Sequence, residues 1–382
     1  MKIFSKKNSD ISICILCFFV SFLFLILLIF MSHKDFSERE NRALQQFPKP
    51  NLESLADGSF FSLLSDFSAD QFPARSFFCS ISSLSELAIA RNECNNVIVA
   101  NDGYLIARSQ NQNNNILSKN LNAIYSFLEE NRDTPSFLLV APRGIDVVSR
   151  NLPIFFSKDF GKAEYNMLNE TIAQDKLISA RDKLEKLSEE GQKIWYKTDH
   201  HWTTKGAYEA YLLICESLGE NAYPLEYFNI ETATDSFLGT CFSRSGLPEI
   251  TCSTDTVELF RYFDDENIKV THKSTKKTVY GFYDFSALTK KDKYQIFLGG
   301  NHEILEIRDT KKNKPQLLLI KDSFANSLIP FLALHYDIDV VDLRYYNLSL
   351  NALTENKKFD KILLVYGIDT LSSDLTCSNI AK

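Results

Sequence analysis

Four consecutive residues near the middle of the chain, Asp199-His200-His201-Trp202, include side chains suited to proton transfer. An acid placed two residues before a histidine can orient the imidazole, which can then act as a general base. A serine hydroxyl needs such a base because it is a poor nucleophile at neutral pH. Asp199 and His201 therefore predict two members of a catalytic triad, and the missing member is a nucleophile.

The best candidate for that nucleophile is Ser323. It follows an apolar run, residues 317–320, and the pair Lys321-Asp322, and a helical pattern begins after it. A strand-to-helix turn would place the serine at a helix N-terminus, where free backbone N–H groups can stabilise an oxyanion. A serine at that position can also serve only as a helix N-cap. The two motifs together suggest an acyl-transfer enzyme, with both interpretations of Ser323 open.

The histidines leave two further questions open. Either His200 or His201 could be the base, and a metal site would need more ligands from His302, Glu303 or His335. The sequence contains no helix-spaced histidine pair and no clustered carboxylates of the kind that bind metal. We therefore expect neither a metal ion nor another cofactor.

Two residues outside the main motifs are candidates for substrate or oxyanion binding. Arg344 comes at the end of a predicted strand, at the sheet edge where α/β proteins bind ligands, and could contact an anionic substrate or form a structural salt bridge. Asn301 follows two glycines and could donate its amide to the oxyanion or simply shape a turn.

The N-terminal region predicts a membrane anchor. Residues 11–31 contain only apolar side chains, cysteine and serine, and about twenty such residues cross a hydrocarbon core as a helix. Lys2, Lys6 and Lys7 precede this run, so the positive-inside rule places residues 1–10 in the cytoplasm and the remaining chain outside. A cleaved signal peptide is the alternative, but the run is long for one and no small-x-small site follows it.

Composition and charge limit the possible functions of the exported part. The chain has 382 residues, of which 45% are apolar, enough for a sizeable core. Its net charge is −7 and no long Lys/Arg stripe occurs, which argues against nucleic-acid binding. Six of the eight cysteines follow the anchor without zinc-site spacing, and Cys241 and Cys252 flank a turn that a disulfide could close.

The pattern of elements favours an α/β fold in residues 51–382, after a charged juxtamembrane linker at 32–50. Helices are predicted at 52–90 with a break at 72–73, and at 117–130, 169–190, 205–217 and 325–335, with a weaker one near Leu350. Strands are predicted within 97–106 and at 136–142, 193–196, 316–320, 340–343 and 361–365. This alternation indicates a three-layer sheet. Residues 223–306 fit it poorly and are interpreted as a β-containing insertion that could shape a substrate groove or serve as scaffold.

The run Asp199-His200-His201-Trp202 resembles the signature of the DHHW proteins, which are similar to the alginate O-acetyltransferases of the SGNH-hydrolase superfamily. Segments 37–42 with Phe47-Pro48, 70–75 and 101–105 resemble other recurrent segments of that family. The resemblance implies an SGNH-hydrolase-like domain with Asp199 as acid, His201 as base and Ser323 as nucleophile. His200 and Phe324, the neighbours of His201 and Ser323 in the chain, are further candidates for substrate or oxyanion binding. Lys321 stands where glycine is usual, which would alter the approach to the oxyanion or only an exposed strand end.

The same resemblance implies a membrane-anchored, extracytoplasmic O-acetyltransferase or acetylesterase acting on a cell-surface or exported polysaccharide. A polytopic membrane acyltransferase is the implied acyl donor, since an exported enzyme has no obvious access to cytoplasmic acetyl-CoA. The alternative is a noncatalytic polysaccharide-binding or envelope-assembly protein that retains an SGNH-like shell.

Overall fold

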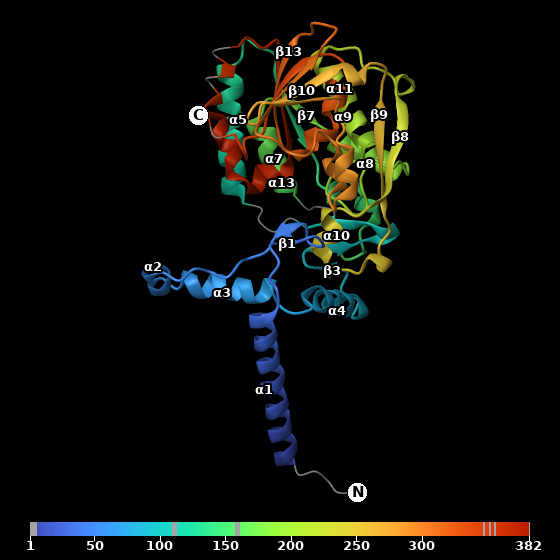
Figure 1. The fold of residues 1–382 in the computed structure, drawn as a ribbon. Coiled ribbons are helices and arrows are strands. Elements are labelled where there is room, and N and C mark those ends of the chain that lie inside the picture. The colour runs from blue at the N-terminus through green and yellow to red at the C-terminus, as the bar shows by residue number, and fades with distance from the viewer. Residues whose placement is uncertain are drawn as a thin grey trace.

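The structure is a computed structural model, and it describes residues 6–108, 113–156, 161–346, 348–350, 353–354 and 357–381. Helix α1 (Lys6–Phe30) stands apart from the rest of the protein (Figure 1). Its segment Ile11–Leu28 is long and apolar enough to cross a membrane, and no other helix in the described ranges passes that test. Most of the described apolar side chains of this helix are therefore exposed, and Phe24, near its C-terminal end, contacts Phe72 and Phe78.

An eight-stranded sheet forms the centre of the body. Its order is β11 (Lys277–Tyr280), β10 (Ile268–His272), β12 (Ile304–Asp309), β14 (Asp337–Val341), β13 (Gln316–Lys321), β15 (Lys361–Gly367), β6 (Ser136–Ala141) and β7 (Leu177–Ser179). The five strands from β14 to β7 are parallel, and β12, β10 and β11 extend the sheet in antiparallel pairing. Parallel strands are usually buried on both faces, which is why β6, β13 and β15 are nearly uninterrupted apolar runs.

Helices cover both faces of this sheet (Figure 1). One face carries α5 (Asn114–Glu130), α7 (Lys162–Thr171), α13 (Ile368–Ser373) and η9 (Leu375–Ala381), and the other carries α6 (Gly144–Val147), α8 (Arg181–Glu189), α9 (Thr204–Leu218) and α11 (Ile329–Leu332). Successive strand side chains point to opposite faces, so Leu317 and Leu319 join the second core while Leu318 and Ile320 join the first. The predicted three-layer α/β sheet is confirmed.

Several predicted elements differ from those observed. The single helix predicted at 169–190 is wrong, because α7 ends at Thr171 and the short edge strand β7 precedes α8. Residues 193–196 form only an isolated bridge between Trp195 and Trp202. The helix predicted at 325–335 is divided into η8 (Ser323–Ser327) and α11. The weaker helix near Leu350 lies largely outside the described residues.

The segment predicted as an insertion contributes to two structures. Its first half forms a bulged antiparallel ribbon of β8 (Asn229–Phe237) and β9 (Asp255–Arg261), with α10 (Thr240–Ser245) between them. Its second half supplies β10 and β11 to the main sheet. The remaining short helical turns are η1 (Asn101–Gly103), η2 (Ser149–Asn151), η3 (Leu225–Tyr227), η4 (Glu249–Thr251), η5 (Asp265–Asn267), η6 (Phe285–Thr289) and η7 (Lys293–Ile296).

The region after α1 folds against the body. It contains β1 (Phe36–Ser37), β2 (Arg42–Ala43), α2 (Leu52–Ala56), α3 (Ser59–Asp70), α4 (Arg75–Ala88) and a small sheet of β3 (Glu93–Cys94), β4 (Val97–Val99) and β5 (Leu105–Ala107). The residues predicted as a linker are docked, since the Arg39 guanidinium donates to the carbonyls of Ser76, Gly246 and Leu247 at 2.7–3.0 Å.

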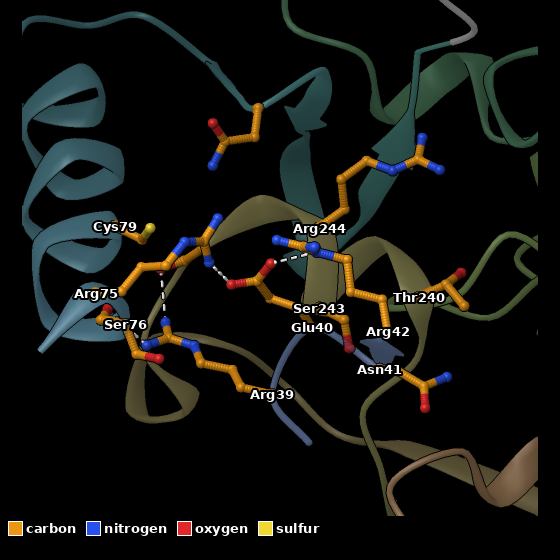
Figure 2. Close-up of a pocket in the computed structure, with 12 residues that line it drawn as sticks. Arg39, Glu40, Asn41, Arg42, Arg75, Ser76, Cys79, Thr240, Ser243 and Arg244 are labelled. Atoms are coloured by element: carbon orange, nitrogen blue, oxygen red, sulfur yellow. Dashed lines mark hydrogen bonds and ion pairs between the residues drawn. The ribbon is translucent and has the colours of Figure 1, made fainter. Parts of the chain in front are cut away.

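Figure 2 shows the hollow of 490 Å³ that this docking leaves between the hairpin at 39–42, α4 and α10. Four arginines line it: Arg39, Arg42, Arg75 and Arg244. Glu40 forms ion pairs with both Arg42 and Arg75 inside the hollow. These partly exposed ion pairs join the segment after α1 to α4.

All eight cysteines lie in the described ranges, and none of them is in a disulfide. The proposed link between Cys241 and Cys252 is therefore absent from this structure. Cys241 is instead buried in a small apolar core with Phe242 and Leu247, where Cys252 packs at the edge.

Candidate active site

The loop that carries Asp199 and His201 is tied down at both ends. The bridge between Trp195 and Trp202 closes it, and the Tyr196 N–H donates to the His201 carbonyl at 3.2 Å. Inside the loop, the Thr198 N–H and hydroxyl donate to one oxygen of Asp255 at 2.7 and 2.6 Å. Residues 196–201 thus form a rigid turn fixed to the start of β9.

The structure brings the three predicted triad residues together. The His201 Nδ1–H donates to Asp199 Oδ2 at 2.6 Å, and the Ser323 hydroxyl donates to His201 Nε2 at 2.8 Å. The side chains of Asp199 and His201 are only 1% and 5% exposed. These distances lie within the reach that general-base activation of a serine requires.

Asp322 orients the turn that presents Ser323. One carboxylate oxygen accepts from the Phe324 N–H at 3.0 Å, and the other accepts from the Gly367 N–H and the Thr370 hydroxyl, each at 2.7 Å. The N-cap of η8 is therefore Asp322, and Ser323 is the first residue of the turn. The turn itself supplies no acceptor for the N–H of its first residue. The Ser323 N–H is therefore suited to donate a hydrogen bond to an oxyanion.

Thr240, a residue that no sequence motif revealed, holds the other side of Asp199. Its N–H and its hydroxyl donate to Asp199 Oδ1 at 2.8 and 2.7 Å. The preceding Gly239 lies so close that an added Cβ would be 2.3 Å from the Asp199 Cβ. The backbone of this segment can approach the carboxylate only because residue 239 has no side chain.

The two adjacent histidines occupy different environments. His200 directs its Nδ1 to the Thr240 hydroxyl at 2.6 Å, and its side chain is 40% exposed. Desolvation opposes its charged form, but the Asp199 carboxylate outweighs this effect and raises the pKa of His200. Burial, reinforced by the neighbouring His200, lowers the pKa of His201 to about 4. His201 is therefore neutral at neutral pH, as a base must be.

The charge of Asp199 is preserved despite its burial. Desolvation alone would raise the pKa of this carboxyl, but His200 and His201 favour the carboxylate and hold its pKa well below the usual value. An ionised Asp199 fixes the proton of the His201 ring on Nδ1 and leaves Nε2 free to accept.

Tyr294 packs directly on the base. Its ring stacks on the His201 ring with centroids 4.0 Å apart and planes inclined by 5°. The hydroxyl lies 3.3 Å from the Ser323 carbonyl and 3.1 Å from Ser327 Oγ. Tyr294 lies in the predicted insertion without a recognisable motif, so only the folded structure reveals its place.

A cavity of 120 Å³ opens at Ser323. Apolar and cationic side chains from several elements form its walls: Leu105, Ile106, Ala107, Pro142, Arg143, Trp195, His200, Cys241, Phe324 and Arg344, with Asp199, Asp369 and Thr370. His200, Phe324 and Arg344 were predicted near the substrate, and all three line this cavity. Arg143, which follows β6 and donates its Nε–H to Asp369 at 2.5 Å, was not predicted.

Arg344 and Lys321 share one buried acid. Arg344 makes a two-pronged contact with Asp342, with Nε and Nη2 donating at 2.8 and 2.6 Å. Lys321 is buried, and its Nζ lies 3.4 Å from the same carboxylate. Arg344 thus has the structural salt bridge and also borders the cavity.

Lys321 is not an exposed strand end. Its ammonium donates to Asn301 Oδ1 at 2.8 Å and to Asn326 Oδ1 at 2.7 Å. Burial lowers the pKa of Lys321 to about 8. Asn301 is engaged in this network and does not line the cavity at Ser323, so its predicted oxyanion role has no support from its position.

The donor atoms of Asp199, His200 and His201 lie within 4.8 Å of one another, a spacing that a metal ion could use. Both ring nitrogens of His201 already have protein partners, however, namely Asp199 and Ser323. The chemistry of this donor set fits proton transfer better than metal coordination.

The fold and the site define a three-layer α/β protein in which Asp199, His201 and Ser323 meet where β13 ends. The model of the DHHW protein family matches residues 182–341, which confirms the predicted resemblance. A search of curated proteins finds no match.

Solved structures with a similar fold include a DHHW family protein from Eubacterium siraeum, with a TM-score of 0.61, 19% identity, and coverage of 75% of this chain and 95% of that one. Bacillus cereus PatB1 has a TM-score of 0.61 and 20% identity, with coverage of 73% and 98%. The O-acetyltransferase domain of Pseudomonas putida AlgJ overlaps less well, with a TM-score of 0.46, 14% identity, and coverage of 73% and 94%.

Proposed function

We propose that this protein is a serine-dependent O-acyltransferase or acetylesterase. The observation that carries the proposal is the continuous chain of hydrogen bonds from Asp199 through His201 to Ser323, at 2.6 and 2.8 Å. A helix cap alone would explain neither the contact of Ser323 with a buried imidazole nor the carboxylate behind that imidazole. A noncatalytic protein with the same fold would not require this arrangement.

Acylation would begin when Ser323 Oγ attacks the carbonyl carbon of an acyl donor. The hydroxyl proton moves to His201 Nε2, and Asp199 stabilises the resulting imidazolium. The carbonyl oxygen becomes an oxyanion, to which the Ser323 N–H can donate. Collapse of this intermediate breaks the bond to the leaving group, which receives the proton from His201, and leaves an acyl ester on Ser323.

Deacylation would repeat these steps with an acceptor hydroxyl. His201 removes the proton of the acceptor as its oxygen attacks the acyl-serine, and then returns that proton to Ser323 Oγ. A sugar hydroxyl as acceptor gives transfer, and water gives hydrolysis. The outcome depends on acceptor binding and on the exclusion of water from the cavity.

The cavity supports a short acyl group. Its small volume of 120 Å³ suits an acetyl group better than a long chain. Phe324 and Trp195 provide apolar walls, and Arg143 and Arg344 provide cationic ones. A cell-surface or exported polysaccharide is the proposed acceptor, on the strength of the resemblance to alginate O-acetyltransferases.

The proposed organisation follows from α1. Residues 1–10 would be cytoplasmic, 11–31 would span the membrane, and 32–382 would lie outside, with residues 51–382 as the SGNH-hydrolase-like domain. A polytopic membrane acyltransferase is the proposed donor of the acyl group, because the site would be separated from cytoplasmic acetyl-CoA by the bilayer.

Hydrolysis of a chromogenic acetyl ester by the purified full-length protein tests the chemistry. Ser323→Ala and His201→Ala should both abolish the activity while retaining the parent thermal unfolding profile. Ser274→Ala is a matched control, because Ser274 is exposed on the turn between β10 and β11. Mass spectrometry of the protein quenched during turnover should locate the acyl group on Ser323.

Activity that survives Ser323→Ala would reject this proposal. An inactive parent with no acyl-serine, together with binding of the polysaccharide, would favour the noncatalytic binding protein. A cellular phenotype that is rescued equally by the parent and by Ser323→Ala would favour a role in envelope assembly.

A further inference from the structure

Helix α4 turns its apolar face outward, whereas a helix on a water-soluble body normally turns its apolar face inward. Serines contact the body along most of its inner side: Ser83 Oγ donates to the Ser245 carbonyl at 2.7 Å, and Ser80 Oγ lies 3.2 Å from the Gly246 carbonyl. Leu87, near the end of the helix, packs against the small apolar core around Cys241. The side chains that face away are large and apolar. Phe77, Phe78, Ile81 and Leu84 are 40–61% exposed.

This outward face is continuous along the helix. Residues three, four and seven positions apart share one side of an α-helix, and positions 77, 78, 81, 84, 85 and 88 form such a stripe of Phe, Phe, Ile, Leu, Ser and Ala. The stripe contains no charged residue. A helix on a globular protein normally turns such a stripe toward the core, so the environment of this one must itself be apolar.

The position of α1 identifies that environment. Phe24 lies within the span Ile11–Leu28, and its ring packs on Phe72, with centroids 4.7 Å apart, and near Phe78, at 6.3 Å. Phe72 comes just before α4, and Phe78 belongs to the outward stripe. A helix whose first turn contacts a residue of the membrane span lies at the depth of that span.

The arrangement in Figure 1 agrees with this conclusion. Helix α4 lies at the base of the body, crosswise to α1, on the side toward which α1 extends. Its serine face is turned to α10, and among the described residues its apolar face meets only Phe24 and Phe72, near Phe78, which leaves Phe77, Ile81 and Leu84 exposed. An amphipathic helix in the plane of a membrane has this orientation.

We propose that the stripe of Phe77, Phe78, Ile81, Leu84 and Ala88 is inserted into the interfacial layer of the bilayer that α1 spans, so that α4 is a second membrane contact. This inference rests on the proposed membrane anchor and not on the proposed chemistry. Continuity with Phe24 favours lipid over a protein partner.

The second contact would set the height of the active site. Helix α4 is bonded to Ser245 and Gly246, at the end of α10, and α10 begins at Thr240, which holds Asp199. One short helix therefore connects the proposed lipid contact with the triad. A single anchor would let the body tilt, whereas two contacts would orient the cavity toward a donor in the same membrane.

Quenching of tryptophan by lipid tests the proposal on the full-length protein. Vesicles of phosphatidylcholine and phosphatidylglycerol would carry phosphatidylcholine brominated near the top of its acyl chains. Ile81→Trp places the probe on the stripe, Phe18→Trp reports the span, and Phe285→Trp reports an exposed site on the body. The native Trp195 and Trp202 are buried and give a constant background.

Glu86→Trp is the matched control, since residue 86 lies on the side of α4 opposite to residue 81. The emission that Ile81→Trp adds should fall roughly twofold in brominated vesicles, as expected for an interfacial depth of about 5–10 Å. Phe18→Trp should also be quenched, and the emission added by Glu86→Trp and Phe285→Trp should change little.

Absence of quenching at residue 81 with quenching at residue 18 would overturn the inference and leave the anchor standing. Absence of quenching at both positions would overturn this inference and the proposed membrane anchor as well. Equal quenching at residues 81 and 86 would also reject it, because a helix lying on the membrane must distinguish its two sides. Ester hydrolysis by the same samples reports the proposed chemistry independently.

Discussion

Thr240 and Asp199 form the contact on which the geometry of the site depends. Thr240 donates its N–H and its hydroxyl to Asp199 Oδ1, at 2.8 and 2.7 Å, and leaves Oδ2 for His201 at 2.6 Å. The Thr240 hydroxyl also accepts from His200 Nδ1 at 2.6 Å. A residue 39 positions beyond His201, the proposed base, thus holds the carboxylate that is bonded to that histidine.

Removal of the Thr240 hydroxyl should impair the chemical step. Thr240→Val preserves the shape and the N–H bond but deletes one hydrogen bond to a carboxylate, and we expect kcat to fall about tenfold with KM little changed. Thr240→Ser, which restores the hydroxyl, should recover most of the loss. Steady-state kinetics with the acetyl ester measure both, and an unchanged kcat in Thr240→Val would contradict this role.

On the acid side of the pH profile, the activity should be lost only at an unusually low pH. Only neutral His201 can accept the Ser323 proton, so activity is lost as the pH falls through the pKa of His201. Because burial and His200 lower that pKa from 6.5 to about 4, kcat/KM should remain high well below pH 6.5 and decline near pH 4. A limb at the ordinary histidine value would show that His201 is more solvated than this structure indicates.

His200→Gln should raise the pH at which activity is lost on the acid side of the profile. The raised pKa of His200 makes it the histidine that is protonated first, and its charge opposes a proton on His201. Without that repulsion the pKa of His201 rises toward its ordinary value, so activity is lost at a higher pH than in the parent. The pH profile of kcat/KM is the measurement, and a limb that stays in place would exclude this coupling.

Substitutions of Tyr294 should separate stacking from hydrogen bonding. Tyr294→Phe keeps the ring that packs on His201 at 4.0 Å, so we expect a small decrease in kcat and in melting temperature. Tyr294→Ala removes a buried ring and should cost about 3 kcal/mol of stability as well as most of the activity. Thermal unfolding and kinetics on the same preparations distinguish the effects, and equal behaviour of the two variants would refute the stacking role.

Lys321→Met should destabilise the turn that carries Ser323. The methionine fills the volume but leaves Asn326 Oδ1 without its donor, a loss of about 2 kcal/mol in the free energy of unfolding. Chemical denaturation measures this loss. Lys358→Met is the control because that lysine precedes β15 outside this network, and equal stability of the two variants would argue against a structural role for Lys321.

The sequence predicts the triad better than it predicts the surroundings of the triad. Local patterns make Asp199, His201 and Ser323 candidates, because the first two are two residues apart and the serine stands at a strand-to-turn junction. The choice of His201 over His200, and of a nucleophile over an N-cap for Ser323, rests on the resemblance to the DHHW proteins. Thr240 and Tyr294 act only through proximity in the folded chain, and neither has a motif. Their roles become visible only in the folded structure, where the ribbon of β8 and β9 and the segment after it lie beside the loop at 196–201.

The fold was predictable where strands were long and apolar. The sheet strands at 136–141, 316–321 and 361–367 were recognised because burial on both faces makes them continuous apolar runs. The edge strand β7 was missed within a predicted helix, since Leu177 and Ile178 also fit helical spacing and three residues give too little pattern to decide. Pairing with β6 determines its conformation.

The hydrogen bonds from Gly367 and Thr370 to Asp322 have a consequence for the chain while it is being synthesised. The acid and the base are made first, the nucleophile more than a hundred residues later, and the two groups that hold its turn later still. During the proposed export, a partly threaded chain would have Asp199 and His201 but no oriented Ser323. Catalysis would thus switch on only after β15 and α13 arrive, so no half-exported intermediate could attack esters along its route.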